Sequence, residues 1–322
     1  MKSIVITANT SWYIYNFRKN TILALINAGY KVTAISPLDD YSNKLVELGC
    51  RHIHIFIDQG GKNILLDIKT IISFYCIFKK IKPRIVLNFT PKNNIYSTIS
   101  ASLNGIKSIN NISGLGIAFT KKNILFYLVK FLYIFSQSKA DVIFFQNKED
   151  RKLFDNYNIA PNVKKIQIAG SGVDLNRFQL STKKDVKPIK FLLASRLLYE
   201  KGVTYYIDAA KVLKKKYNKN IEFNLIGFFN NSPSAIKKEY ISKKVDQGII
   251  NYLGVSDNIE NIIAGIDCMI LPSFYGEGIP KSLMEAAAMG KPIITTDNVG
   301  CRDVVENNIN GYLISPKSLK EL

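Results

Sequence analysis

Short apolar segments alternate with segments of helical periodicity along the whole chain, and this alternation limits the possible folds more than any other feature. Residues 4–7, 31–36 and 84–89 have the length and composition of buried strands, and residues 65–81 form a long apolar helix that ends before Pro83. Strands that are separated by helices at short spacing pair in parallel. The sequence therefore predicts an α/β fold built on doubly wound parallel sheets.

The length and the course of the chain indicate two domains. A chain of 322 residues corresponds to about two domains of ordinary size, and its 47% hydrophobic content is enough for two cores. The alternation reaches a strand at 165–169 and restarts at 191–195 after a lysine-rich segment. We therefore expect a first domain at 1–169, a linker at 170–188 and a second domain at 189–322.

The balance of charged residues points to an anionic partner. The chain carries 44 basic and 25 acidic residues, a net charge of +19. Nucleic acid, an anionic membrane and anionic substrates are the candidates. The sequence contains no zinc finger, RNP-type aromatic motif or long basic arm, so we expect no nucleic-acid partner. An anionic membrane surface fits the composition better.

Residues 121–139, KKNILFYLVKFLYIFSQSK, combine a bulky apolar body with lysines at both ends and one in the middle. Two interpretations stay open for this segment. It is either a helix buried against the first sheet or an interfacial helix that lies on anionic lipid. Its apolar part is too short, and too interrupted by lysine, to span a bilayer.

Cysteine and histidine usage gives no metal site. The four cysteines include no C-x-x-C pair, and the two histidines alternate with isoleucines, as on one face of a strand. No D-x-D motif follows a predicted strand, so we expect neither a metal nor a cofactor.

The N-terminal MKSIVITAN enters a strand directly, without the features of a signal peptide. We expect a reducing, cytoplasmic setting.

Residues 268–305 contain a strand, a loop, a helix and a second strand in succession. The loop at 272–278 leads to a helix that begins near Pro280 and ends before Gly290. Free N–H groups and the positive end of the helix dipole at such a helix start suit a phosphate. We therefore expect an anion site at the start of this helix.

Glu277 in this loop and Glu285 on this helix are separated by seven residues. A carboxylate beside phosphates is stabilised only if it accepts hydrogen bonds, which points to the hydroxyl groups of a sugar or a ribose. The alternative is that neither binds a ligand, so that Glu277 is a solvated loop residue and Glu285 an exposed helix residue. Small residues at 276, 278 and 286–288 favour the ligand-binding interpretation, because they permit close backbone approach. Since Glu277 lies in a loop, Glu277→Ala is expected to remove activity and leave the fold intact.

Arg196 and Lys201 occur in the segment SRLLYEKG, at the end of the strand predicted at 191–195. A guanidinium and an ammonium at a strand end can stabilise the negative charge that grows on a leaving diphosphate. Otherwise they are two surface cations that precede a helix.

Taken together, these motifs resemble those of the retaining glycosyltransferases of family 4. The segment GEGIPKSLMEAAAMGKPII resembles their E-x7-E signature, Arg196 and Lys201 match their R-x4-K pair, and GSGVDLNRFQL at 170–180 resembles their crossover into the second domain. The SGLG loop at 113–116 resembles that of members that build bacterial surface polysaccharides. The resemblance implies the GT-B fold, in which two Rossmann-like domains with doubly wound parallel sheets face a cleft.

The resemblance also implies roles for individual residues on the donor side. Arg196 and Lys201 are expected to offset the charge of the diphosphate, Glu277 to bind hydroxyls of the donor sugar, and Glu285 to bind the ribose. Further donor contacts are expected from a set of mainly small or apolar residues: Gly227, Val255, Gly278, Ile279, Pro280, Ser282 and Leu283.

On the acceptor side, the candidates are residues that follow predicted strands of the first domain: Asn9, Lys92, Asn93, Gly114 and Gly116. Lys92 and Asn93 lie in the predicted loop TPKNN at 90–94, where they either contact the acceptor or cap a helix. Members of the family often have a histidine in this neighbourhood, whereas this chain has a proline, so no histidine base is carried over. Members also continue through further helices, which the second domain is expected to lack.

The resulting prediction is a retaining, metal-independent hexosyltransferase. It would move a UDP-activated hexose or N-acetylhexosamine to a lipid-linked saccharide in O-antigen, capsule or similar polysaccharide synthesis. Its expected partners are the nucleotide sugar, the lipid-linked acceptor and an anionic membrane surface, and its expected location is the inner face of the cytoplasmic membrane. The alternatives are a UDP-sugar 2-epimerase, which the shortage of histidine disfavours, and a non-enzymatic membrane-associated scaffold, which the intact motifs disfavour.

Overall fold

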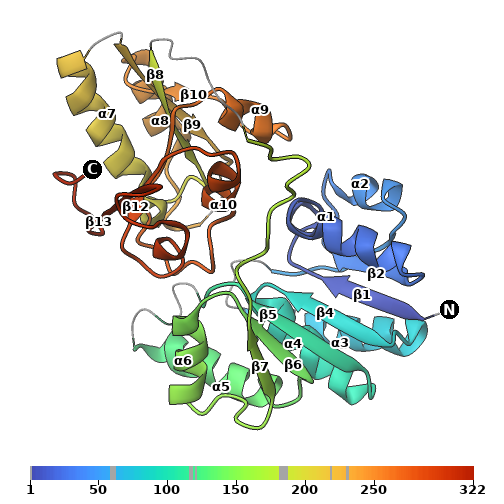
Figure 1. Cartoon of the computed structure of the whole chain (residues 1–322). Coiled ribbons are helices and arrows are strands. Elements are labelled where there is room, and N and C mark those ends of the chain that lie inside the picture. Colours follow the sequence, from blue (N-terminus) through green and yellow to red (C-terminus); the bar gives the residue numbers. More distant parts are fainter. Residues whose placement is uncertain are drawn as a thin grey trace. The chain divides into compact units, whose positions relative to one another are not determined.

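The computed structural model describes residues 2–58, 63–115, 119, 122–180, 188–217, 220–229 and 232–322. The chain divides into two compact units, Met1–Ser171 and Gly172–Leu322. Each unit contains one sheet, and every strand pair in both sheets is parallel. The predicted α/β class with two doubly wound sheets is therefore confirmed (Figure 1). Part of the predicted linker, residues 181–187, lies outside the described residues.

The first unit is a regular alternation of strands and helices around a seven-stranded sheet of order β3-β2-β1-β4-β5-β6-β7. Its elements are β1 (Ser3–Thr7), α1 (Ser11–Asn27), β2 (Lys31–Ser36), α2 (Ser42–Glu47), β3 (Arg51–His54), α3 (Ile64–Ile81), β4 (Ile85–Phe89), α4 (Pro91–Leu103), β5 (Lys107–Ile112), α5 (Ile124–Gln137), β6 (Val142–Phe145), α6 (Lys148–Asn156) and β7 (Lys164–Gln167).

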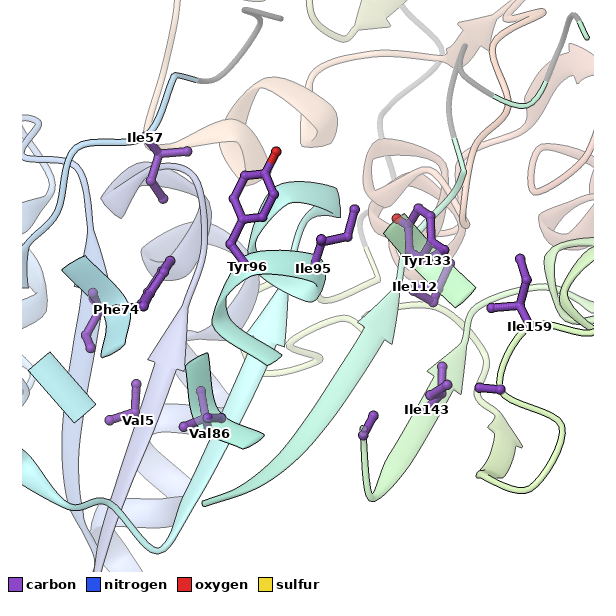
Figure 2. Packing of buried hydrophobic residues seen from close by; sticks show 14 of the residues in the cluster. Val5, Ile57, Phe74, Val86, Ile95, Tyr96, Ile112, Tyr133, Ile143 and Ile159 are labelled. Carbon is purple, nitrogen blue, oxygen red and sulfur yellow. The ribbon is translucent and has the colours of Figure 1, made fainter. Parts of the chain in front are cut away.

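Helices cover both faces of this sheet. Alternate residues of each strand point to opposite faces, so Ile6 of β1 packs with α1 and α2, whereas its neighbour Val5 packs with α3. The helices α3, α4 and α5 follow one another on the second face, with α4 in contact with both of the others (Figure 1). Figure 2 shows the apolar layer on that face, where strand residues such as Val5 lie together with Phe74 of α3 and Tyr133 of α5.

Local signals in the sequence explain where several helices begin. Thr10, Asn63, Asn123 and Asn147 precede α1, α3, α5 and α6, and each side chain accepts a hydrogen bond from an amide of the first turn. Such N-caps satisfy amide groups that have no partner within the helix. Lys82, in the left-handed conformation, ends α3 before Pro83.

The loop predicted at 90–94 is wrong, because α4 begins within it at Pro91. Thr90 precedes the helix with a φ of 73°, a conformation that a threonine rarely adopts. Proline is favourable at the first position of a helix, since the amide hydrogen that it lacks would have no helical partner. Pro91, which lies inside the predicted loop, therefore starts the helix.

The second unit is built on a six-stranded sheet of order β10-β9-β8-β11-β12-β13. Its elements are β8 (Ile189–Ala194), η2 (Tyr199–Lys201), α7 (Val203–Tyr217), β9 (Ile221–Ile226), α8 (Lys238–Asp246), β10 (Asn251–Tyr252), α9 (Ile259–Ala264), β11 (Cys268–Leu271), α10 (Lys281–Ala288), β12 (Ile293–Thr296), η4 (Arg302–Val304) and β13 (Gly311–Ile314). The central strand β11 is buried along its whole length between two apolar clusters.

Each sheet has a point at which the order of its strands reverses. The first lies between the adjacent strands β1 and β4, and the second lies between β8 and β11. Ligands of open α/β sheets bind outside the carboxyl ends of the strands at such points. The topology therefore predicts that ligands bind at the loops that follow these four strands.

Within the described part of the chain, no helix has both the length and the apolar character needed to cross a membrane.

Candidate active site

The loops at the switch point of the second sheet bring three of the predicted site residues together. Arg196 follows β8, Lys201 ends the short helix η2, and Glu277 lies in the loop between β11 and α10. The ammonium of Lys201 forms an ion pair with the carboxylate of Glu277. The side chains of this pair are only 9% and 12% exposed. The interpretation of Glu277 as a solvated loop residue is therefore wrong.

Tyr275 is the part of this arrangement that the sequence did not reveal. The guanidinium carbon of Arg196 lies 5.8 Å from the centre of its ring, and Nζ of Lys201 lies 5.1 Å from the same centre. A cation within about 6 Å of an aromatic ring is attracted to its negative face. One ring thus holds both cations of the predicted R-x4-K pair beside the carboxylate of Glu277.

The loop that carries Tyr275 and Glu277 is fixed by contacts to neighbouring loops. The amide of Phe274 donates to the carbonyl of Glu200 (2.8 Å), and the side-chain amide of Asn298 donates to the carbonyl of Tyr275 (2.8 Å). Ser273 Oγ lies 3.2 Å from Glu277 Oε1. These bonds hold the carboxylate in place from both sides of the loop.

Two glycines are required where these loops meet. Gly300 has a φ of +77°, and a Cβ atom there would overlap the carbonyl oxygen of Gly278. Gly227, after β9, has a φ of +154°, and its Cβ would overlap the carbonyl oxygen of Ser195. Any other residue type would separate the loops at the carboxyl ends of the strands.

Glu285 lies on α10 and is 8% exposed, so the interpretation of an exposed helix residue is also wrong. Burial raises the pKa of its carboxyl to about 7, although the positive charges of Lys281 and Arg177 oppose the rise. Arg177 in turn forms an ion pair of 2.6 Å with Glu260. The two glutamates of the predicted signature are therefore both held inside the second unit beside cations.

The other predicted donor residues differ in what they expose. Val255 is exposed after β10, and Ile279 and Ser282 are half-buried. The residue at the N-cap of α10 is Pro280, whose side chain makes no capping hydrogen bond. Gly278 and Pro280 are buried, and the side chain of Leu283 belongs to the apolar core. Leu283 can therefore meet a ligand only through its main chain.

The predicted acceptor residues lie at the corresponding edge of the first sheet. Asn9 follows β1, Lys92 and Asn93 are in the first turn of α4 after β4, and Gly114 follows β5. Lys92 forms an ion pair of 2.6 Å with Asp67 of α3. Gly116 lies outside the described residues.

Asn93 is fully buried, and its side-chain amide donates to Thr90 Oγ1 (2.9 Å). This bond joins two side chains and leaves the start of α4 without a side-chain cap, so the choice between helix capping and acceptor contact stays open. Among the residues that the structure describes, no three histidine, cysteine, aspartate or glutamate side chains lie where they could together hold a metal ion.

Both halves of the chain match models of glycosyltransferase families. Residues 3–147 match the family described as "Glycosyl transferase 4-like", and residues 175–322 match "Glycosyl transferases group 1". The two matches fall in the two structural units, which places the candidate site of the second unit inside the second match.

Two bacterial relatives align with most of the chain. One is the N,N'-diacetylbacillosaminyl-diphospho-undecaprenol alpha-1,3-N-acetylgalactosaminyltransferase of Campylobacter jejuni, which is 29% identical over 96% of this chain and 84% of its own length. The other is the UDP-Gal:alpha-D-GlcNAc-diphosphoundecaprenol alpha-1,3-galactosyltransferase of Escherichia coli, which is 27% identical over 86% of this chain and 73% of its own.

Solved structures support the fold. The crystal structure of Anabaena HepE in complex with UDP and glucose superposes with a TM-score of 0.75 at 16% identity, covering 100% of this chain and 88% of that one. At this identity the similarity concerns the arrangement of the elements alone.

Proposed function

Because the chain belongs to the glycosyltransferases with the two-domain GT-B fold, we propose that it is a retaining, metal-independent hexosyltransferase. Its donor is a UDP-activated hexose or N-acetylhexosamine. Its acceptor is a lipid-linked saccharide in O-antigen, capsule or similar polysaccharide synthesis, at the inner face of the cytoplasmic membrane. The observation that carries the proposal is the grouping of Arg196, Lys201 and Glu277 around Tyr275 at the switch point of the second sheet.

The two cations act on the leaving group. Arg196 is exposed and has five N–H donors in a fixed fork, which suits a diphosphate. Lys201 is buried beside Glu277, and its ammonium has three donors, so it can serve the carboxylate and a phosphate oxygen together. Both charges stabilise the negative charge that develops on the diphosphate as the bond to the sugar breaks.

Glu277 orients the donor sugar, since its carboxylate is held in place by Lys201 and Ser273 and is an acceptor of the kind that binds sugar hydroxyls. Glu285 accepts hydrogen bonds from the ribose. Its raised pKa fits this role, because a carboxyl near the midpoint of its titration is readily ionised when hydroxyl donors arrive. The positive end of the α10 helix dipole lies at the start of this helix and favours the negative charge of the same donor.

The lipid-linked acceptor is proposed from the two bacterial relatives, whose names specify diphospho-undecaprenol saccharides. In the proposed retaining step, the acceptor oxygen forms a bond to the anomeric carbon on the face from which the diphosphate departs. The acceptor proton passes to the leaving phosphate oxygen, so the products are the glycoside and UDP. This route needs no nucleophile from the protein.

A donor screen tests the proposal. Purified protein is incubated with individual UDP-sugars, with and without a diphospho-undecaprenol saccharide, and UDP release is followed. We expect acceptor-dependent release with one hexose or N-acetylhexosamine donor. Conversion of the UDP-sugar into an epimer without acceptor would instead indicate the epimerase, and the absence of any nucleotide binding would indicate the scaffold.

A further inference from the structure

The outer surfaces of α3 and α5 expose an unusual amount of apolar side chain. Ten large apolar residues on these helices are between 38% and 88% exposed: Ile64, Leu65, Ile68 and Ile72 of α3, and Ile124, Tyr127, Leu128, Phe131, Ile134 and Phe135 of α5. We call these residues the α3–α5 surface. So many exposed apolar side chains on two helices of one unit mark a surface that binds a partner or a membrane.

These residues are not part of the core of the first unit. The opposite sides of the same helices already fill the apolar layer against the sheet, where Phe74 and Tyr133 lie (Figure 2). Phe78 of α3 belongs to the same apolar cluster. The intervening helix α4 contacts both α3 and α5, and most of its residues between Asn93 and Ala101 are buried. The α3–α5 surface is therefore left over after the first unit has packed.

The exposed charged side chains of α3, and those directly before and after α5, are lysines. Lys69, Lys79 and Lys80 are exposed on α3, and Lys122 and Lys139 are exposed at the two ends of α5. The sequence of α5 contains no acidic residue, and the single acid of α3, Asp67, is paired with a lysine of α4. Apolar side chains flanked by lysines are the composition that lies in the headgroup region of an anionic bilayer.

We propose that the α3–α5 surface inserts into the interface of an anionic membrane and that α3 contributes to this contact as much as α5. The proposal rests on the proposed function, because a lipid-linked acceptor has to be met at a bilayer. It corrects the sequence-based view, in which only the segment at 121–139 was considered for lipid contact.

The direction of the strands determines which end of the α3–α5 surface lies near the predicted acceptor residues. All strands of the first sheet are parallel, so α3, α4 and α5 begin at the edge where β3, β4 and β5 end. Ile64 and Ile124, at the starts of α3 and α5, are thus near the edge that carries Lys92 and Gly114. An acceptor whose lipid lies in the bilayer would present its saccharide at that edge.

The test measures binding of the whole chain to vesicles of phosphatidylglycerol with phosphatidylcholine, and to vesicles of phosphatidylcholine alone. One variant changes four exposed apolar residues and another reverses four lysines: Ile68→Gln, Ile72→Gln, Leu128→Gln and Phe131→Gln in the first, and Lys69→Glu, Lys79→Glu, Lys80→Glu and Lys139→Glu in the second. All eight side chains are exposed, so their replacement leaves no cavity. Lys130 is not changed, because it is half-buried over the ring of Tyr157.

Matched controls come from exposed positions of the second unit. Val212→Gln with Ile309→Gln matches the apolar changes, because these residues are 60% and 72% exposed. Lys211→Glu with Lys215→Glu matches the change of charge on exposed lysines. Circular dichroism and thermal melting show whether each variant is folded.

We expect the wild-type chain and both controls to bind the anionic vesicles and to dissociate at high salt. Each lysine contributes a factor of about five to the partition coefficient, and each apolar side chain that buries half of its area contributes a similar factor of about five. Both four-residue variants should therefore lose binding by more than about a hundredfold.

Equal binding to neutral vesicles, or unchanged binding by both folded variants, would overturn the proposal. An association of the wild-type chain with itself that the apolar variant abolishes, without vesicle binding, would assign the surface to a second copy. Calorimetry with UDP separates this result from the proposed function. A chain that binds UDP but not vesicles refutes only the surface, whereas one that binds vesicles but no nucleotide refutes the proposed function.

Discussion

Breaking the ion pair between Lys201 and Glu277 should destabilise the protein as well as inactivate it. The pair is nearly buried, with side chains 9% and 12% exposed. Removing one partner of a buried pair leaves an uncompensated charge and costs about 3–5 kcal/mol. Because this pair keeps some contact with solvent, we expect Glu277→Ala to cost about 2–3 kcal/mol of unfolding free energy. This expectation replaces the sequence-based one that the fold would stay intact.

The assay is thermal melting of the wild type, Glu277→Ala, Lys201→Met and the double variant, without ligand. A loss of this size lowers the melting temperature by about 4–12 °C for a unit of this length. The double variant removes both charges and should recover part of that loss, which a double-mutant cycle quantifies. A Glu277→Ala protein as stable as the wild type, or losses that simply add in the double variant, would refute the reasoning.

Further predictions concern the same site. Arg196→Ala and Lys201→Met should each lower kcat more than they raise the KM for the donor, since the charge that these side chains meet is greatest in the transition state. Steady-state kinetics in which only KM changes would show instead that they bind the donor and the transition state equally well. Gly300→Ala should abolish turnover and lower stability because its Cβ meets the carbonyl of Gly278, whereas Gly248→Ala, at a φ of +66° with open space around it, should cost only about 1 kcal/mol. Because burial raises the pKa of Glu285 to about 7, the folded protein retains a proton that the unfolded chain loses near its ordinary pKa, so this group's contribution to stability falls as the pH rises through 7. Nucleotide-sugar binding, which needs the ionised carboxylate, should strengthen between about pH 6 and 8, and calorimetry of Glu285→Gln should show a flatter profile. EDTA should leave the transfer rate unchanged, and a rate that is abolished by EDTA and restored by magnesium would contradict the metal-free proposal.

The alternation of the elements could be predicted because its causes are local. The strand predicted at 268–271 is β11, and it was recognisable as a short apolar run between breakers. The start of α6 follows Asn147, whose side chain accepts a hydrogen bond from the amide of Asp150 (2.7 Å). Capping and apolar periodicity involve residues within one or two turns of each other, so both can be recognised in the sequence alone.

The features that were missed depend on contacts distant in sequence or on rare backbone conformations. Lys201 and Glu277 are 76 residues apart, and nothing in the spacing of the motifs indicates that they form an ion pair around Tyr275. The positive φ of Thr90, which lets α4 start at Pro91, has no signature in a threonine. For α3, apolar periodicity identified a helix, but it could not show which of its faces the rest of the unit would leave uncovered.

The anomeric configuration of the product tests the central claim most directly. The protein is supplied with the proposed UDP-α-sugar donor and a diphospho-undecaprenol saccharide, and the new glycosidic linkage is analysed by nuclear magnetic resonance. We predict an α-linkage that forms with stoichiometric release of UDP and that is lost in Glu277→Gln. A β-linkage, or formation of the α-linkage by Glu277→Gln at the wild-type rate, would contradict the account.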